Sequence, residues 1–381
     1  MTLGFMQGGE RYYSISNYLK ETFGGKTIKL SLDAGFTCPN RDGTLGTGGC
    51  AFCSSSGSGE FASALSCRAG ANDTSSVSGT ASCSSGISTD TAVTTASTDT
   101  TTVASSDTTT ATSTSKINAE ISGSSGESGI SDTSISEQIQ LLSDKWPDAH
   151  HIAYFQNHTN TYAPVETLRR YYYSALRDPR IDGIAIATRP DCLGTAVLDL
   201  LEEIHQEHFL WVELGLQTIH ARTSEMMGIG YPLEVLDDAV RELQKRGIRA
   251  VLHIILGLPG ESREDMFATV RHVAALHPFG VKFHMLNLVR GSRLYEMMPD
   301  YVPFRSIEEY SELVVDLLEI LPPDITVHRL TADTQRGLLV APEWSYRKRT
   351  ILNTINRRLK ERNTCQGAKY IPNSQGHDVL R

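Results

Sequence analysis

Short apolar runs alternate with amphipathic stretches along most of the sequence, and this regular alternation limits the folds that the chain can adopt. Near-continuous apolar runs are typical of strands buried on both faces, while apolar residues at helical spacing indicate helices that cover a sheet. The predicted strands are residues 27–32, 151–155, 183–187, 210–216, 250–256, 281–288 and 325–330. The predicted helices between them lie near residues 137–145, 164–177, 194–208, 232–246, 262–275 and 306–321.

Strict alternation of strand and helix predicts a parallel sheet covered by helices. Seven strands with six intervening helices suit an α/β fold of the partial (βα)6 TIM-like barrel type. A doubly wound open sheet is the alternative, because alternation alone does not separate the two folds. A further helix within residues 11–23 is expected to cap the barrel, and Ser306 with Glu309 fits a capping box at the start of the last helix.

Residues 54–135 differ from the rest of the chain because they consist mainly of Ser, Thr, Gly, Ala and Asp. Eight acidic residues oppose Arg68 and Lys116, so this segment contributes −6 to the formal charge of −9. Such a segment buries too little apolar surface to offset the entropy of ordering, which predicts a disordered low-complexity insertion. We therefore expect four parts: residues 1–53 with the first strand and a cysteine loop, the insertion 54–135, the remaining barrel 136–330, and a C-terminal extension 331–381 with a basic helix.

Cys38, Cys50 and Cys53 lie in a glycine-rich loop directly after the first predicted strand. Glycines allow such a loop to bend, so the three sulfur atoms can converge on one point. Thiolates favour zinc, copper(I) or iron–sulfur clusters, and a closed site normally takes four protein ligands. Three thiols leave one position open, unless a zinc site takes its fourth ligand from Cys192, Cys365 or a histidine.

Two segments around these cysteines resemble the radical S-adenosylmethionine (SAM) superfamily, and within it the subfamily related to the catalytic domain of Elongator. Residues 29–43 read Lys-Leu-Ser-Leu-Asp-Ala-Gly-Phe-Thr-Cys-Pro-Asn-Arg-Asp-Gly, and residues 48–53 read Gly-Gly-Cys-Ala-Phe-Cys. The resemblance implies a [4Fe-4S] cluster in which Cys38, Cys50 and Cys53 hold three irons and SAM chelates the fourth. It also implies a partial barrel and the cleavage of SAM to a 5′-deoxyadenosyl radical.

Polar residues follow the predicted strands at the ends where parallel α/β folds gather their functional side chains. After the second strand, the resemblance implies an approach to the SAM amino group, which makes Thr159, Asn160 and Thr161 candidates; hydroxyls that merely cap the next helix are the alternative. After the third strand, Arg189 could hold a carboxylate or phosphate with its planar fork, oriented by Asp191. A purely structural Arg189–Asp191 pair is the other interpretation.

The fourth predicted strand carries Glu213 and ends at Gln217. This segment resembles Elongator-type and coproporphyrinogen-dehydrogenase-type segments whose glutamine lies near SAM. Both side chains would be costly to bury without partners, which favours a polar ligand inside the barrel. His253, His284 and His328 lie in later strands, where a lone histidine is more often a satisfied core residue than a catalyst.

Residues 345–362 form a predicted helix with seven basic residues and an apolar stripe on one face. A basic face often does no more than solvate a helix. Next to an Elongator-like core, it would suit the phosphates of RNA.

The sequence has no run of eighteen apolar residues and no secretory signal, and its odd count of seven cysteines fits a reducing compartment. We therefore expect a cytoplasmic protein without a membrane partner. The resemblance implies radical chemistry on the side chain of a tRNA wobble uridine, with tRNA and a reducing electron donor such as flavodoxin or ferredoxin as partners. A zinc-stabilised, noncatalytic RNA-binding module is the alternative function.

Overall fold

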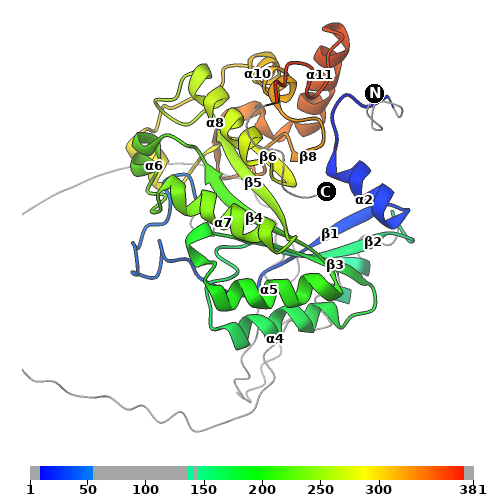
Figure 1. Cartoon of the computed structure of the whole chain (residues 1–381). Helices are drawn as coiled ribbons and strands as arrows, with labels where there is room; N and C mark the ends of the chain where they lie inside the picture. The colour runs from blue at the N-terminus through cyan, green and yellow to red at the C-terminus, as the bar shows by residue number, and fades with distance from the viewer. Residues whose placement is uncertain (1–8, 55–134, 137, 141–144, 373–381) are drawn as a thin grey trace, which may run out of the picture. The chain divides into compact units, whose positions relative to one another are not determined.

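Seven parallel strands form the main sheet of the computed structural model, which describes residues 9–54, 135–136, 138–140 and 145–372 (Figure 1). Each strand pairs with the next one in the sequence. A doubly wound sheet reverses its strand order, so that alternative is wrong and the predicted partial barrel is confirmed. The strands are β1 Thr27–Leu32, β2 His150–Phe155, β3 Ile181–Thr188, β4 Phe209–Gln217, β5 Arg249–Leu256, β6 Gly280–Met285 and β8 Thr326–Arg329.

Helices follow the strands in the predicted order, and α4 and α5 lie along one side of the sheet (Figure 1). The long helices are α4 Val165–Leu176, α5 Thr195–Glu207, α7 Leu233–Lys245, α8 Arg263–Leu276, α10 Ile307–Ile320 and α11 Lys348–Glu361. Two short helices that the sequence did not predict are α6 Ala221–Met227 and α9 Arg293–Met297. The expected helix near residues 137–145 lies partly outside the described residues, within which 138–140 are helical. The expected insertion likewise lies outside them, except for its two terminal residues.

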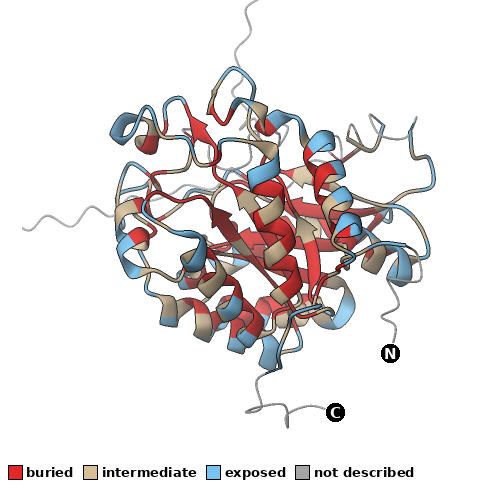
Figure 2. Ribbon diagram, turned by 90° about the horizontal axis from the view of Figure 1, so that it is seen from above, coloured by how far each residue is buried: buried red, intermediate tan, exposed pale blue. Residues whose placement is uncertain are grey.

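Alternate side chains of each strand point to opposite faces of the sheet, which separates two apolar clusters. The outer cluster joins strand residues such as Leu30 and Ile184 to the covering helices, and Figure 2 shows buried and exposed residues along most of them. Helix α10 differs, because its exposed residues are confined to its first turn. The inner cluster joins Trp211 and neighbouring strand residues to helix α2, Ile15–Phe23. Helix α2 thus caps the amino-terminal end of the barrel, as predicted, and the space above this apolar layer is left for other side chains.

The predicted strand 281–288 is wrong in its second half. Strand β6 ends at Met285, and Leu288–Val289 forms a separate strand, β7, which pairs antiparallel with β9, Leu339–Ala341. Apolar character gave no sign of this change of partner, because both halves of the run are buried.

Capping hydrogen bonds at two helices and the contacts of Gln366 further stabilise the fold. Ser262 and Asp265 form a reciprocal capping box on α8, whereas the Ser306 hydroxyl caps α10 and the Glu309 carboxylate accepts instead from the Arg305 N–H over 2.7 Å. The fully buried Gln366 donates hydrogen bonds from Nε2 to the carbonyls of Pro322 and Ile325, just before β8. Its Oε1 accepts from the Tyr13 N–H over 2.9 Å, so this side chain connects the segment before α2 to the segment after α11. No helix within the described ranges combines the length and apolar character needed to span a membrane.

Candidate active site

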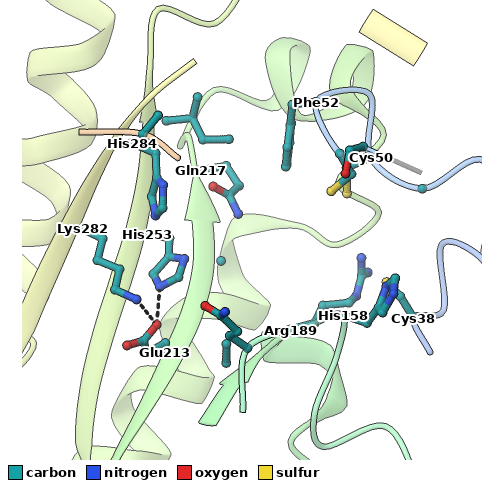
Figure 3. Close-up of a pocket in the computed structure, with 18 of the residues that line it drawn as sticks. Cys38, Cys50, Phe52, His158, Arg189, Glu213, Gln217, His253, Lys282 and His284 are labelled. Carbon is teal, nitrogen blue, oxygen red and sulfur yellow. Dashed lines mark hydrogen bonds and ion pairs between the residues drawn. The ribbon is translucent and has the colours of Figure 1, made fainter. Parts of the chain in front are cut away.

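A cavity of about 230 Å³ opens at the carboxyl ends of the central strands. The loop that carries the three candidate cysteines lies at one end of this cavity, and Glu213, Lys282 and His284 lie at the other (Figure 3). Gln217 and Arg189 lie between the two ends. The structure therefore brings the cysteines and most of the polar strand residues selected from the sequence to one enclosed space.

Backbone hydrogen bonds hold the cysteine loop between α6 and α9. The N–H of Ala51 donates to the Met227 carbonyl over 2.8 Å, and the N–H of Leu294 donates to the Ala51 carbonyl over 2.8 Å. Ala51, Met227 and Leu294 also belong to one buried apolar cluster, against which Phe52 packs. The loop position thus depends on segments that lie far from it in the sequence.

Asn40 connects the loop to the chain segment that follows α6. Its Nδ2 donates to the Gly228 carbonyl over 2.9 Å and lies 3.2 Å from both the Ile229 carbonyl and the Cys50 Sγ. Gly230 has a φ of +85°, and a Cβ there would lie 3.0 Å from the Asn40 Oδ1. A larger residue at position 230 would therefore be strained and would crowd Asn40.

The three candidate ligands are free cysteines in polar surroundings. A hydrogen bond from Cys53 lowers the pKa of Cys50 to about 7, and the Asn40 amide and the charges of Arg189 and Arg293 act in the same direction. The same hydrogen bond, together with burial, raises the pKa of Cys53 well above its usual value. Among the described residues, no group of three His, Cys, Asp or Glu side chains lies close enough to hold a single metal ion.

Only one of the three polar candidates after β2 lines the cavity. Thr159 does so, and its Oγ1 is buried without a hydrogen-bond partner in the described structure. Asn160 donates from Nδ2 to the carbonyls of Asn157 and Ala187, each over 2.9 Å. The Thr161 hydroxyl lies 2.6 Å from the Thr188 hydroxyl. Asn160 and Thr161 therefore hold the loop in place, and Thr159 is the candidate of this group that lines the cavity.

Arg189 lines the cavity, and most of its fork is already occupied. Its Nε and Nη2 donate to the Asp191 carboxylate over 2.9 and 2.7 Å, and its Nη1 donates to the Ile229 carbonyl over 2.9 Å. The guanidinium also lies 4.8 Å from the centre of the Tyr231 ring. The structural Arg189–Asp191 pair, which the sequence left as an alternative, is thus present. The charge of Arg189 also helps to lower the pKa of Cys50 at the cysteine end of the cavity.

Glu213 is 1% exposed and is fully surrounded by donors. It accepts hydrogen bonds from the Tyr154 hydroxyl over 2.6 Å and the Trp211 Nε1 over 2.9 Å, pairs with the Lys282 ammonium, and lies 2.9 Å from the His253 Nε2. Burial acts to raise the pKa of Glu213, but the charge of Lys282 and the hydrogen bond to His253 outweigh it, so this pKa lies well below its usual value. The partners of Glu213 are therefore protein side chains, whereas the sequence had suggested that a polar ligand would pair with it.

Gln217 lies at the end of β4 in an unusual backbone conformation. Its φ is +64°, in the left-handed region that non-glycine residues rarely adopt, and the β4–β5 register shifts between Gly215 and Gln217. A Cβ at Gly215 would lie 2.7 Å from the Gln217 Nε2, so the missing side chain at 215 gives this amide its room. Strained residues gather at functional sites, and Gln217 lines the cavity.

Lys282 and Tyr154 also line the cavity, and both were missed in the sequence. The Lys282 Nζ donates a hydrogen bond to the Tyr154 hydroxyl over 2.9 Å. A period of two could have revealed Lys282, because Lys282 and His284 are two residues apart along an otherwise apolar strand and must face the same way. The identity of Glu213 as the partner of Lys282 could not be read from that period.

The strand histidines divide into two groups. His253 and His284 line the cavity, whereas His328 lies between the rings of Trp211 and Phe279, and its buried Nδ1 has no hydrogen-bond partner in the described structure. Burial, followed by the charge of Lys282, lowers the pKa of His253 to about 4, and burial lowers the pKa of His284 as well. The His284 Nε2 is a buried polar atom without a hydrogen-bond partner in the described structure. Such orphaned groups in a cavity fit a site that a ligand completes.

Comparisons with known proteins agree with this geometry. The model of the radical SAM superfamily matches residues 122–273, and that of the Radical_SAM C-terminal domain matches residues 278–361. The cysteine loop precedes both matched segments. The protein YtqA of Bacillus subtilis is 37% identical to this chain over 94% of the chain and 92% of its own length.

Two further relatives are more distant. The tRNA uridine(34) acetyltransferase of Methanocaldococcus jannaschii is 28% identical over 42% of this chain and 30% of that protein. The solved structure of the archaeal Methanocaldococcus infernus Elp3 with an N-terminal deletion shares the fold, with a TM-score of 0.53 and 18% identity over 61% of this chain and 59% of that one. The family models and the extended similarity to YtqA show that this chain belongs to the radical SAM superfamily, whose enzymes use S-adenosylmethionine and a [4Fe-4S] cluster.

Proposed function

We propose that this radical SAM enzyme modifies the side chain of a tRNA wobble uridine, and that Cys38, Cys50 and Cys53 hold its [4Fe-4S] cluster. The observation that carries the proposal is the cavity that joins three thiols from one loop to a polar inner end, with exposed arginines in the segment that follows its lining residue Asp333 in the sequence. The thiols would hold the cofactor, the cavity would hold the reacting groups, and these arginines would hold the nucleic acid.

The cysteine loop suits a cluster by its donors and by its surroundings. Thiolates are the usual ligands of such clusters, and each of them binds a different iron atom, so the spacing required around one metal ion does not apply. The charges of Arg189 and Arg293 and the hydrogen bond from Asn40 favour the thiolate form of Cys50. When bound, the cluster supplies an electron that cleaves SAM to a 5′-deoxyadenosyl radical.

The remaining side chains of the cavity would position SAM and the substrate and exclude water. Gln217, held in its left-handed conformation, and Thr159, with its unpartnered hydroxyl, are the groups we assign to SAM. Asn160 and Thr161 act by fixing the loop that carries Thr159. Glu213 acts by orienting His253 and Lys282, and Arg189 acts through its charge at the cysteine end.

Support for a tRNA substrate comes from the arginine rim, which we define as Arg336, Arg347 and Arg349. All three are exposed, and within the described ranges they form no ion pair. They lie close in the sequence to Asp333, which lines the cavity and pairs with the Lys348 ammonium. The guanidinium of Arg336 lies 4.8 Å from the centre of the exposed Tyr346 ring. Exposed arginines with an accessible aromatic ring suit phosphates and unstacked bases.

The later basic residues of the predicted basic helix are less available for RNA contact than the sequence suggested. Arg358 pairs with Glu312 of α10 over 2.9 Å, and Arg362 pairs with Asp316 and Glu319 of the same helix over 2.7 and 2.9 Å. These side chains join α11 to α10, so the rim at the start of α11 is the part we assign to RNA. The similarity to a tRNA uridine(34) acetyltransferase supports the same substrate class. We further place the enzyme in the cytoplasm, with a flavodoxin- or ferredoxin-type electron donor.

The first test is anaerobic reconstitution of the full chain with iron and sulfide, followed by reduction with dithionite in the presence of SAM. We expect 5′-deoxyadenosine from the wild type and none from Cys50→Ala. The matched control is Cys365→Ala, a cysteine outside the loop, which should retain the wild-type yield. About one zinc per chain and no cluster would instead support the noncatalytic zinc module.

The second test addresses the substrate. Transfer RNA from a deletion strain should lack a modified wobble uridine that reappears when the wild-type gene, but not the Cys50→Ala gene, is returned. An unchanged nucleoside profile, combined with normal 5′-deoxyadenosine formation, would remove tRNA as the substrate while leaving the chemistry in place.

A further inference from the structure

The inner end of the cavity has more basic than acidic side chains. Lys282 and Arg329 line it, and the Lys29 Nζ lies 4.9 Å from the centre of the Tyr154 ring in the same layer. The carboxylates among the described lining residues are Glu213 and Asp333. Lys348 reaches Asp333 from α11, and burial lowers the pKa of Lys29, so this layer does not carry four full positive charges.

Both carboxylates are already used by the protein. Glu213 receives hydrogen bonds from the Tyr154 hydroxyl and the Trp211 ring and pairs with Lys282. Asp333 pairs with the Lys348 ammonium and lies 3.2 Å from the Arg329 Nη2. Arg329 and Lys348 thus share the one carboxylate of Asp333, and the Arg329 side chain, 29% exposed, also lines the cavity.

Two lining groups retain donors that face this space. The Arg329 guanidinium contacts Asp333 through one nitrogen, and its other nitrogens make no hydrogen bond to the residues that the structure describes. The His284 Nε2 is buried and unpartnered within the same part of the chain. Arg329 of β8 lies beside Lys282 of β6 in the sheet, and the ring centres of His253 and His284 lie 5.1 Å apart in the same cavity.

We propose that the inner end of the cavity binds an oxyanion of the substrate, a carboxylate or a phosphate, between the Arg329 guanidinium and the His284 Nε2. This inference rests on the proposed use of the cavity as the reaction site. An oxyanion would pair with the Arg329 guanidinium and accept hydrogen bonds from both free donors. It would also place the attached carbon atoms between the inner end and the cysteine loop, which is where the hydrogen to be abstracted must lie. The bound group is therefore a carboxylate or a phosphate of the tRNA nucleotide that reacts, held by its anionic end.

The test is isothermal titration calorimetry on the reconstituted full chain without oxygen. The probes are malonate, inorganic phosphate and malonamide, the last being a neutral analogue of malonate. We expect one of the two anions to bind saturably and malonamide not to bind, and the anion with the higher affinity identifies the source as a carboxylate or a phosphate. Binding of neither anion, or equal binding of malonamide, would overturn the proposal.

Variants connect the binding to the two named donors. Arg329→Gln should weaken the anion by about tenfold or more, and Arg329→Lys should restore most of the affinity because it returns the charge. His284→Leu is a second, independent variant and should weaken binding by about threefold or more. Arg271→Gln, on the exposed face of α8, is the control and should bind as the wild type does. Unchanged affinity in both Arg329→Gln and His284→Leu, with circular dichroism showing a folded chain, would contradict the assignment.

The outcome can be separated from that of the proposed function. Formation of 5′-deoxyadenosine without substrate requires the cluster and SAM but not the anion site. Normal 5′-deoxyadenosine formation without anion binding would remove this inference alone. Anion binding without 5′-deoxyadenosine would leave the inner site intact and remove the radical chemistry.

Discussion

The side-chain amide of Asn40 lies 3.2 Å from the Cys50 Sγ and at the same time donates to the Gly228 carbonyl over 2.9 Å. One side chain thus links the cysteine loop to the turn after α6. The loop has no regular secondary structure, so contacts of this kind determine where the sulfur atoms lie.

Replacing Asn40 with alanine should reduce cluster binding. The change removes the donor to Cys50 and leaves the Gly228 carbonyl with one partner fewer, at a cost of about 1–3 kcal/mol. We expect a lower iron content per chain after reconstitution and a lower melting temperature. The control is Asn353→Ala on the exposed side of α11, which should match the wild type in both measurements. Full iron content in Asn40→Ala would show that the backbone contacts of the loop suffice.

The Glu213–Lys282 pair should show strong coupling in a double-mutant cycle. Each side chain is almost fully buried, so removing one partner leaves an uncompensated charge and should cost about 3–5 kcal/mol. The double variant Glu213→Gln/Lys282→Met should cost less than the sum of the single variants, by about 1 kcal/mol or more. Urea unfolding of the full chain measures all three.

A surface pair provides the comparison for this cycle. Lys245 and Glu242 lie 2.6 Å apart on α7 with side chains 69% and 37% exposed. Their coupling should be below about 1 kcal/mol. Equal coupling in the two cycles would contradict a special role for the buried pair.

Acid should destabilise the fold through the buried histidines. The pKa of His253 is about 4 in the folded chain, against about 6.5 in the unfolded chain. Between these values the unfolded state binds more protons, so stability falls as the pH decreases from about 6.5 towards 4, by up to about 3 kcal/mol. His284 acts in the same direction.

His253→Gln should make this pH dependence shallower, because the glutamine amide does not titrate. The measurement is the urea midpoint of the full chain at about pH 7 and about pH 5. Asn353→Ala, a non-titrating change on the exposed side of α11, is the control and should leave the slope nearly unchanged. If His253→Gln does not change the dependence of the urea midpoint on pH, other groups cause the acid sensitivity.

The arginine rim should dominate tRNA affinity. The triple variant Arg336→Gln/Arg347→Gln/Arg349→Gln should weaken binding and reduce the slope of log K against log salt by about 2, since each lost phosphate contact removes roughly 0.7–0.9. Filter binding at several salt concentrations measures both quantities.

The control for the rim comes from the same helix. Arg358→Gln/Arg362→Gln removes two charges whose partners are the α10 carboxylates, so it should lower stability and leave tRNA affinity nearly unchanged. The opposite result, with loss of affinity only in this double variant, would move the RNA surface to the α10 side of α11.

Much of the fold and part of the site could be predicted from the sequence. Alternating apolar runs predicted the parallel partial barrel, because the period of a strand and of a helix is a local property. The same locality explains the error at residues 281–288, where an apolar run continued although the chain changed its partner strand. Polar residues after the strands were found for the same reason, since the carboxyl ends of parallel strands share one edge.

The sequence by itself determined the seven strands of the main sheet, most of the long helices, the thiol loop and the positions of Glu213 and Gln217 on β4, but not β7, β9, α6 or α9. Only the tertiary structure decided which of these side chains reach the cavity: Thr159 does, while Asn160 and Thr161 are used within their loop. It also decided that Lys282 faces Glu213 and that Arg362 meets the carboxylates of α10. The physical reason is that a period fixes the face on which a side chain lies, whereas its partner comes from a distant segment that only folding brings near.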